Sequence, residues 1–435
     1  MRVLQALGWY FPDSLGGTEV YVKGLAARLQ RAGVDVCIVA PRACERVEQY
    51  SFEGVQVFRY PDAAVNGARA RDSHMDHWID VLDRVDPHIV DFHSLTSGLS
   101  LDHLRIVKQR ATQAVVTIHV PLVCQRGTLL RFGRVPCDGD LSRRPCAACR
   151  LHARGIPRPL ASASAYIPAI VKRQSRTLPL PPFVRAVLEA DNRAAEHRDR
   201  LNETFACADR VVAVSRWLAD TLLCNGLPAD KLAICPQGVD RRARHAPANR
   251  GDRLRVGFIG RYDKVKGLHV LVDAIRRLPK DLPIECRVWG IASSAEARSY
   301  FDGVVRRAAR DPRIVFLGSA DSSEALASID VLAIPSIWME TGPLVLLEAF
   351  AAGVPVIGSN LGGIAEKIRH GVDGWLVAPD DARELSQALS ACARDRTRVE
   401  AWRSQIPAVR TMDEVAGDTH DLYRSLVRES VLTAT

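Results

Sequence analysis

The chain has 435 residues, more than one ordinary hydrophobic core accommodates, so we expect two domains. Hydrophobic residues make up 47% and charged residues 25%, as in globular proteins, and no apolar run approaches the roughly 20 residues of a membrane-spanning helix. The net charge of +9 suits either arginines spread over solvated surfaces or attraction to an anion, but no basic region with interleaved aromatic residues indicates nucleic acid.

The N-terminal segment does not resemble a secretory signal. Its apolar start, Val3–Leu7, is interrupted by Gly8 and followed by Pro12 and Asp13, so it lacks the hydrophobic central region of such signals. We therefore expect a cytoplasmic protein. Its eleven cysteines are then expected to be thiols or metal ligands rather than a disulfide framework.

The first half of the chain alternates short apolar runs with helical stretches, which is typical of a parallel sheet flanked by helices. It opens with the strand Val3–Leu7, a loop containing Gly16 and Gly17, and a helix over about residues 18–32. This alternation predicts a Rossmann-like domain over residues 1–247. Its further predicted strands are Val34–Ala40, His88–Phe92, Ala114–Ile118, Val211–Val214 and Leu232–Cys235.

The pair Gly16-Gly17 lies between the first strand and the first helix. Small residues at a helix start let the backbone approach a phosphate or sugar closely, although a plain turn has the same composition. The pair does not complete a dinucleotide-binding G-x-G-x-x-G, because Gly8 is too far from Gly16. A nicotinamide-dependent dehydrogenase is therefore disfavoured.

The alternation stops over about residues 121–202, which we interpret as an insertion in the first domain. Its four cysteines could form a tetrahedral thiolate site, since two are separated by two residues, the usual spacing of zinc ligands. Structural zinc, free thiols and an iron–sulfur cluster remain alternatives at this stage. The later part, Ile156–Phe183, mixes proline, apolar and basic residues and suits either a solvated face or contact with an acidic membrane. The cysteines are Cys124, Cys137, Cys146 and Cys149.

A polar linker over residues 241–253 precedes a second alternating region, which predicts another Rossmann-like domain over residues 248–411. The last segment, residues 412–435, has helical character. Predicted strands of this domain are Leu254–Ile259, Ile284–Val288, Arg313–Leu317, Val331–Ile334 and Val354–Ile357.

The segment Val331–Pro379 carries the clearest chemical signal. A strand ends at Pro335, and Thr341 or Gly342 is expected to cap a helix that begins at Pro343. The free N–H groups and partial positive charge of a helix start can seat a phosphate. The carboxylates of Glu340 and Glu348 could accept paired hydrogen bonds from the hydroxyls of a sugar or ribose.

The two glutamates are separated by seven residues, and their surroundings resemble glycosyltransferase family 4. The resemblance is carried by SIWME ending at Glu340, LLEA around Glu348, and the following AGVPV and GGIAE runs. It implies the GT-B fold, two Rossmann-like domains facing an interdomain cleft. It also implies a retaining transferase without a catalytic metal, so no cofactor is expected for catalysis, and structural zinc remains one of the alternatives for the four cysteines.

The resemblance also implies roles for individual residues. Glu348 would hold the donor ribose and Glu340 the transferred sugar, while Arg261 and Lys266 would grip the donor diphosphate. The chemistry favours fixed cations there, because cleavage of the sugar–phosphate bond leaves negative charge on the nucleotide. His119, in the run Thr117-Ile118-His119, resembles the family histidine near the donor sugar. Gly16 and Gly17 would lie near the phosphates, and Thr341, Gly342, Pro343 and Leu344 would line the donor site.

These observations predict a hexosyltransferase that moves a sugar from a nucleotide diphosphate sugar to an acceptor hydroxyl, in polysaccharide or glycolipid synthesis. The acceptor would be a glycan or a lipid-linked molecule, with peripheral contact to the anionic inner face of a membrane. The residues from 412 onward would pack back on the first domain. Two alternatives remain: a sugar-nucleotide epimerase of the same fold, and a catalytically silent binding protein.

Overall fold

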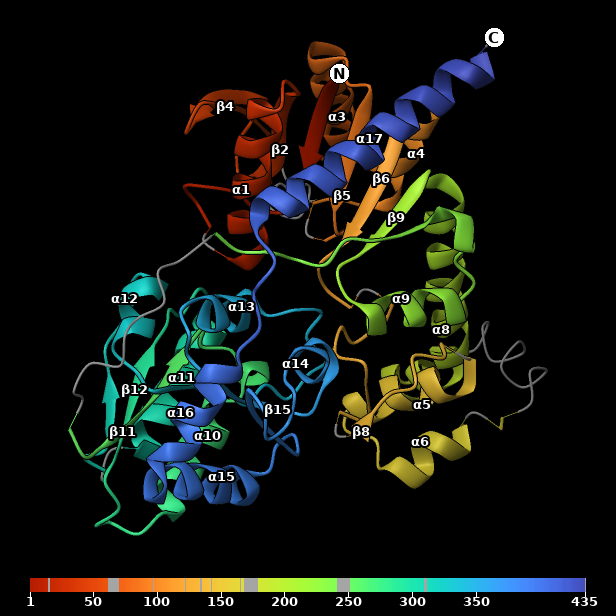
Figure 1. Ribbon diagram of the computed structural model, residues 1–435. Helices are drawn as coiled ribbons and strands as arrows, with labels where there is room; N and C mark the ends of the chain where they lie inside the picture. Colours follow the sequence, from red (N-terminus) through yellow and green to blue (C-terminus); the bar gives the residue numbers. More distant parts are fainter. Residues whose placement is uncertain are drawn as a thin grey trace. The chain divides into compact units, whose positions relative to one another are not determined.

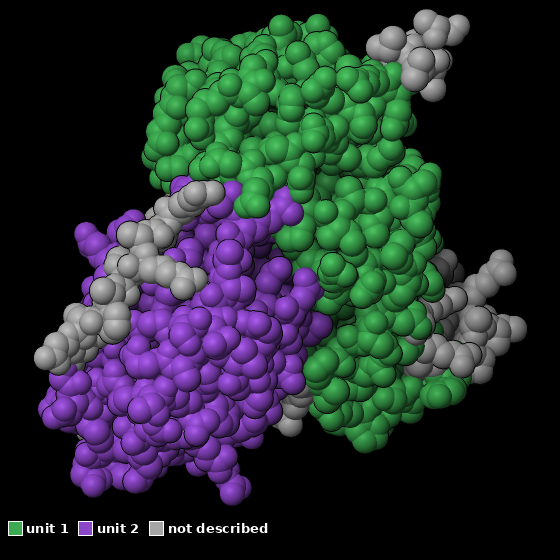
Figure 2. Space-filling model, in the orientation of Figure 1, with its two compact units in different colours: residues 1–236, 412–435 green, residues 237–411 purple. Residues whose placement is uncertain are grey.

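The computed structural model describes residues 1–14, 16–61, 70–96, 98–121, 123–133, 135–141, 143–164, 166–167, 179–240, 251–308 and 311–434. Its contacts divide the chain into two compact units, Met1–Pro236 with Met412–Thr435, and Gln237–Thr411 (Figures 1 and 2). Most of the predicted linker (241–250) and part of the basic segment (168–178) lie outside the described residues. Within the described ranges, no helix is both long and apolar enough to cross a membrane.

Unit 1 contains an eight-stranded sheet in the order β10-β9-β6-β5-β1-β2-β4-β3. All neighbouring strands are parallel except β3 and β4. The central strands are apolar and buried on both faces, as parallel strands between two layers of helices must be. The strands are β1 (Arg2–Ala6), β2 (Asp35–Arg42), β3 (Glu48–Phe52), β4 (Val55–Pro61), β5 (Ile89–His93), β6 (Gln113–Ile118), β9 (Arg210–Ala213) and β10 (Leu232–Ile234).

The helices of unit 1 connect these strands in the usual alternating manner, except for the last helix of the chain, which follows all the strands. They are α1 (Gly17–Arg31), α3 (Ala70–Val85), α4 (Leu101–Gln109), α8 (Pro182–Cys207), α9 (Arg216–Cys224) and α17 (Met412–Ala434).

The hairpin β3–β4 was not predicted from the sequence. Its two-residue turn, Glu53-Gly54, has positive φ at both positions (48° and 82°), the conformation that tight hairpins require. The exposed residues of β3 hide the apolar alternation that would have indicated a strand.

The predicted insertion forms a small substructure between β6 and β9. It comprises β7 (Leu130–Arg131), β8 (Val135–Pro136), α5 (Arg143–Ala153), α6 (Arg158–Ser164) and α8. A separate core of small apolar side chains joins its helices, so this region is held by packing of its own. The core includes Ala147, Ala148, Leu151, Ala161, Ala190 and Ala194.

The last helix, α17, belongs to unit 1 and lies along that unit in Figure 1. At its start, Asp413 accepts a hydrogen bond from Arg28 of α1 over 2.8 Å. Farther along, Tyr423 has no exposed surface. Helix α17 therefore packs on the first unit with one side of its surface.

Unit 2 contains a six-stranded parallel sheet in the order β13-β12-β11-β14-β15-β16. Numbered from its own first strand, this is the 3-2-1-4-5-6 order of doubly wound nucleotide-binding sheets, which bind ligands where the order reverses. The strands are β11 (Leu254–Ile259), β12 (Ile284–Trp289), β13 (Ile314–Phe316), β14 (Val331–Ile334), β15 (Val356–Ser359) and β16 (Gly374–Val377).

The helices of unit 2 cover this sheet with two buried apolar clusters. They are α10 (Leu268–Arg277), α11 (Ala295–Ala308), α12 (Ser322–Ala327), α13 (Leu344–Ala351), α14 (Gly362–Lys367), α15 (Ala382–Arg394) and α16 (Arg396–Gln405).

Candidate active site

The strand order of unit 2 reverses between β11 and β14, and the loops after these two strands are joined. The Ile337 N–H donates to the carbonyl of Val265 over 2.8 Å. Gly267 has a φ of 73°, and a Cβ there would lie 1.8 Å from the carbonyl oxygen of Pro335. Only glycine therefore allows the two loops to approach this closely.

Lys266 and Glu340, one from each loop, form a close ion pair. The Lys266 ammonium lies 2.8 and 2.9 Å from the two carboxylate oxygens of Glu340, and the Ser336 hydroxyl donates to the same carboxylate over 2.6 Å. The side chain of Glu340 is only 6% exposed, against 22% for Lys266. Two residues that the sequence analysis placed at the donor site are thus brought together.

The electrostatics of this pair favour the charged carboxylate. Burial by itself would raise the pKa of Glu340, but the Lys266 ammonium and the hydrogen bond from Ser336 lower it below its usual value. The ammonium also lies 5.5 Å from the centre of the Trp338 ring, a cation–π distance. The pair presents a fixed positive group and an ionised acceptor at the edge of the sheet where the strand order reverses.

Helix α13 follows Glu340 and differs in detail from the prediction. It begins at Leu344 with Pro343 as its N-cap residue, and no side chain caps it, whereas Thr341 or Gly342 was expected to do so. Proline in this place is compatible with the helix start because it lacks an N–H that would need a partner. Glu348 lies half-buried within the helix.

Backbone contacts hold the turn between Glu340 and the helix. The Gly363 N–H donates to the carbonyl of Glu340 over 2.7 Å, and a Cβ at Gly363 would lie 2.5 Å from the carbonyl oxygen of Thr341. The GGIAE run of the sequence therefore supports the glutamate loop through close backbone packing. Sequence reasoning noted this run only as part of the family resemblance.

Arg261 lies in the same loop as Lys266 and is exposed. Among the described residues, its guanidinium does not join the ion pair of Lys266 and Glu340. Its expected role toward a diphosphate stays a prediction.

In unit 1, the strand order reverses between β1 and β5, and His119 lies close to this point, directly after β6. His119 is 7% exposed, and its Nε2 lies 3.0 Å from Nδ1 of His93. Burial lowers the pKa of both histidines to about 3, and His93 lowers the pKa of His119 further. Both imidazoles are therefore neutral at ordinary pH.

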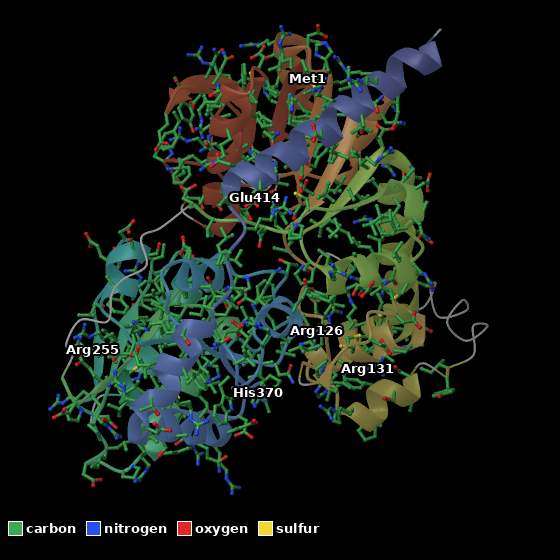
Figure 3. The ribbon with its side chains drawn as sticks, viewed as in Figure 1. Met1, Arg126, Arg131, Arg255, His370 and Glu414 are labelled. Carbon is green, nitrogen blue, oxygen red and sulfur yellow. The ribbon has the colours of Figure 1, made fainter. Side chains whose placement is uncertain are left out.

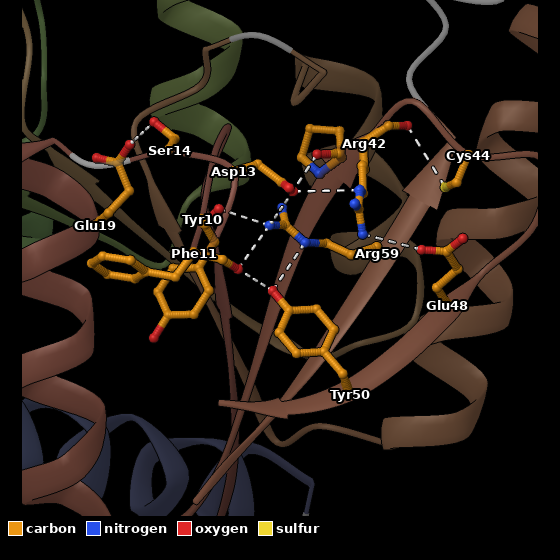
Figure 4. Close-up of polar contacts among 11 residues, drawn as sticks. Tyr10, Phe11, Asp13, Ser14, Glu19, Arg42, Cys44, Glu48, Tyr50 and Arg59 are labelled. Carbon is orange, nitrogen blue, oxygen red and sulfur yellow. Dashed lines mark hydrogen bonds and ion pairs between the residues drawn. The ribbon is translucent and has the colours of Figure 1, made fainter. Parts of the chain in front are cut away.

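The loop before Gly16 is organised by a buried arginine, as Figure 4 shows. Arg59 of β4 is 1% exposed, and its guanidinium donates to the carbonyl oxygens of Tyr10 and Phe11 over 2.7 and 3.0 Å. It also donates to the carboxylate of Asp13 over 2.9 Å. Gly16 is the N-cap residue of α1, which begins at Gly17.

Replacing Arg59 by methionine is expected to destabilise the protein by about 2 kcal/mol, because two carbonyl groups and one carboxylate lose their donor. Chemical denaturation of the variant and the wild type measures the difference. Arg46, an exposed arginine before β3, provides the control: Arg46→Met should change stability by less than about 0.5 kcal/mol. Equal stability of Arg59→Met and wild type would contradict this assignment.

None of the four cysteines of the insertion takes part in a disulfide bond. Burial raises the pKa of Cys146 to about 12, and Cys124, Cys137 and Cys149 add to this rise. Cys149 accepts hydrogen bonds from the Phe132 N–H and from Arg126, which Figure 3 labels in this loop.

No group of three or more His, Cys, Asp or Glu side chains has the arrangement of a metal site in the part of the chain that the structure describes. The zinc site stays a prediction, which metal analysis of the purified protein tests.

The fold belongs to the GT-B class, as similar solved structures show. Sucrose-phosphate synthase from Thermosynechococcus elongatus matches with a TM-score of 0.67 and 18% identity, covering 99% of this chain and 100% of that chain. The Anabaena protein HepE, solved with UDP and glucose, matches with a TM-score of 0.66 and 16% identity, covering 97% and 99%. The predicted fold class is confirmed.

Two family models match the chain: the glycosyl transferase 4-like domain over residues 16–238 and glycosyl transferases group 1 over residues 253–395. The chain therefore belongs to the family of glycosyltransferases that combine these two domains, as its motifs indicated.

Among curated relatives, the amylovoran biosynthesis glycosyltransferase AmsK of Erwinia amylovora is 27% identical over 247 residues, 53% of this chain and 58% of that protein. The phosphatidyl-myo-inositol mannosyltransferase of Mycobacterium leprae is 32% identical over 193 residues, 41% of this chain and 47% of that protein. The chain thus spans about half the length of the curated relatives it matches.

Proposed function

We propose that the protein is a retaining glycosyltransferase that moves a hexosyl unit from a nucleotide diphosphate sugar to a hydroxyl of a glycan or lipid-linked acceptor. The ion pair of Lys266 and Glu340 at the strand reversal of unit 2 carries the proposal. Polysaccharide or glycolipid synthesis is supported by the names of the relatives AmsK and the mannosyltransferase, and a nucleotide sugar donor by the UDP complex of HepE.

In this proposal the two charged groups act on different parts of the donor. The Lys266 ammonium would face the diphosphate and stabilise the negative charge that grows as the sugar–phosphate bond breaks. The ionised Glu340 would accept hydrogen bonds from sugar hydroxyls and so orient the ring. Because both Glu340 oxygens already contact Lys266, the carboxylate and the ammonium hold each other in place before a donor arrives.

The proposed transfer breaks the bond between the anomeric carbon and the diphosphate oxygen, and the bonding electron pair leaves with the diphosphate. A bond then forms from the acceptor oxygen to the same face of the anomeric carbon, and the acceptor proton passes to the departing phosphate oxygen. The charges of Lys266 and Arg261 and the N–H groups at the start of α13 would stabilise the departing diphosphate. Glu348 would hold the ribose.

The replacement Arg261→Ala tests the diphosphate assignment. We expect affinity for every nucleotide diphosphate sugar to fall by about 10-fold, because one exposed charge-assisted contact is lost. Calorimetry with a panel of donors measures this change. Lys264, an exposed cation of the same loop, provides the matched control, and Lys264→Ala should leave donor affinity unchanged. Equal affinity of Arg261→Ala and wild type would contradict the assignment.

Product analysis separates the proposed reaction from its alternatives. Incubation of donor and acceptor should yield a glycoside whose anomeric configuration matches the donor, which NMR of the first product determines. An epimerised donor formed without any acceptor would identify an epimerase instead. Donor binding without either product in an acceptor panel would favour a silent binding protein.

A further inference from the structure

A buried chain of polar groups crosses the core of unit 1 and ends at His119. It runs from Asp91 of β5 to Tyr423 of α17, then to Gln5 of β1, His93 at the end of β5, and His119. None of these residues is more than 7% exposed. Buried polar groups in an apolar sheet are costly unless every hydrogen bond is made. Each group must therefore donate to one neighbour and accept from the other, which gives this chain of hydrogen bonds a direction.

The direction is set at Asp91. Its Oδ1 accepts a hydrogen bond from the Thr117 hydroxyl over 2.9 Å, and its Oδ2 accepts one from the Tyr423 hydroxyl over 2.6 Å. The Thr117 backbone N–H also contributes a hydrogen bond to this carboxylate. A phenol has one proton, so a Tyr423 that donates to Asp91 can only accept from its other neighbour.

That neighbour is the amide of Gln5, whose Nε2 donates to the Tyr423 oxygen over 2.9 Å. Its Oε1 therefore faces the Nε2 of His93 and must accept from it. A neutral imidazole carries one proton, so the proton of His93 is on Nε2 and its Nδ1 accepts. The donor to that Nδ1 is the Nε2–H of His119, 3.0 Å away.

We propose that Asp91 and Tyr423 are positioning residues that fix, through Gln5 and His93, the tautomer of His119 with its proton on Nε2. The Nδ1 of His119 is then a hydrogen-bond acceptor only. On the function proposed above, the role of His119 toward a sugar is to accept a hydroxyl proton in a hydrogen bond. Helix α17 thereby contributes to the active site without touching the substrate.

The burial of the two histidines supports this assignment. Burial lowers the pKa of both to about 3, so neither imidazolium competes with the neutral tautomers near pH 7. The edge of the Tyr21 ring packs on His119, with ring centres 4.8 Å apart, and restricts rotation of the imidazole. An imidazole held in one orientation and one tautomer is pre-organised as an acceptor.

The tautomer is observable by long-range ¹H–¹⁵N NMR of the full chain with ¹⁵N-labelled histidine. Protonated and unprotonated ring nitrogens give well-separated ¹⁵N signals. Signals of the two rings are assigned with His93→Gln and His119→Gln. We expect the wild type to show a protonated Nε2 and an unprotonated Nδ1 in His119.

The variant Asp91→Asn gives a second test because it should reverse the direction of donation along the chain of hydrogen bonds. The hydroxyl and N–H of Thr117 require an oxygen on their side, so the new amide nitrogen faces Tyr423 and donates to it. Tyr423 then donates to Oε1 of Gln5, so the Gln5 amide rotates and its nitrogen donates to Nε2 of His93. The proton of His93 therefore moves to its Nδ1 and is donated to Nε2 of His119, whose own proton moves to Nδ1. We expect kcat to fall about 10–100-fold with the donor KM unchanged.

Tyr423→Phe interrupts the chain and should give His119 a mixture of both tautomers. Thr419→Val is the matched control: its buried hydroxyl lies on the same helix but donates only to the Val415 carbonyl of that helix. This variant should leave the NMR signals and kcat unchanged. It also reports whether a lower kcat in Tyr423→Phe arises from disturbed packing of α17.

A protonated Nδ1 of His119 in the wild type, or a tautomer that Asp91→Asn leaves unchanged, overturns the proposal. The NMR measurement needs no enzymatic activity, so it separates a failure of this proposal from a failure of the transferase function. If His119 has the expected tautomer but the protein shows no transferase activity, the positioning role of the polar chain stands and the transferase function is rejected.

Discussion

Replacing Lys266 by alanine is expected to lower kcat/KM by about 10²–10³-fold, the cost of removing one fixed group that stabilises developing charge. The same change removes the ion-pair partner of Glu340, which is 6% exposed. Burial would then raise the pKa of that carboxyl group, since burial already acts in this direction in the wild type. We therefore expect a loss of stability of about 1–3 kcal/mol together with the loss of activity.

A double variant separates these two effects. Lys266→Ala with Glu340→Ala removes both charges, so no buried carboxylate is left without a partner, and stability should partly recover. On the proposed function, activity should not recover, because Lys266 is the cation assigned to the donor diphosphate. Steady-state kinetics and chemical denaturation of the two single variants, the double variant and Lys264→Ala complete the comparison. Recovery of activity in the double variant would show that Lys266 serves only to neutralise Glu340.

Acidification is expected to destabilise the protein because of the two buried histidines. Their pKa is about 3 in the folded state and about 6.5 when unfolded, so between these values the unfolded chain binds more protons. Stability therefore falls as the pH decreases through this window. From pH 6.5 to pH 5 the loss is about 1.6 kcal/mol for each histidine.

One neighbouring group, Asp91, offsets part of this effect. Asp91 acts in the opposite sense, since burial raises its pKa and the folded state takes up its proton first. Burial also raises the pKa of Tyr423 well above its usual value, so that hydroxyl stays protonated throughout. Ser94 and Thr117 do not titrate, and Tyr21 packs on His119 as a neutral ring.

The variant His93→Gln isolates this contribution. The stability difference between variant and wild type should be constant above about pH 7 and should shift in favour of the variant by about 1.4 kcal/mol per pH unit below pH 6. Urea unfolding at a series of pH values measures it. A pH-independent difference would mean that His93 is not held neutral by its surroundings.

The sequence contained enough information to predict five of the six strands of unit 2, β11 to β15, and to single out Lys266 and Glu340 beside its strand reversal, but the edge strand β16 was missed. Its strands are short apolar runs separated by loops rich in glycine and proline, which makes their order along the chain clear. Lys266 and Glu340 could be brought together because each lies in the loop that follows a strand beside the reversal. The contact itself could not be predicted, since it depends on Gly267 allowing the two loops to approach.

The polar chain of unit 1 was missed for two different reasons. Gln5 and Asp91 do leave a signal, because each is a polar residue inside an otherwise apolar strand, and this pattern could have been questioned. Tyr423 leaves none: it is 332 positions from Asp91, and no local pattern connects a helix at one end of the chain with a strand near the other.

The inclusion of α17 in unit 1 has a consequence for synthesis on the ribosome. Unit 1 is made of residues 1–236 and 412–435, so the whole of unit 2 is translated between its two parts. Until Tyr423 has emerged, Asp91 and Gln5 have no hydrogen-bonding partner from the last helix. Unit 2 can therefore fold before unit 1 is complete, although translation begins with unit 1.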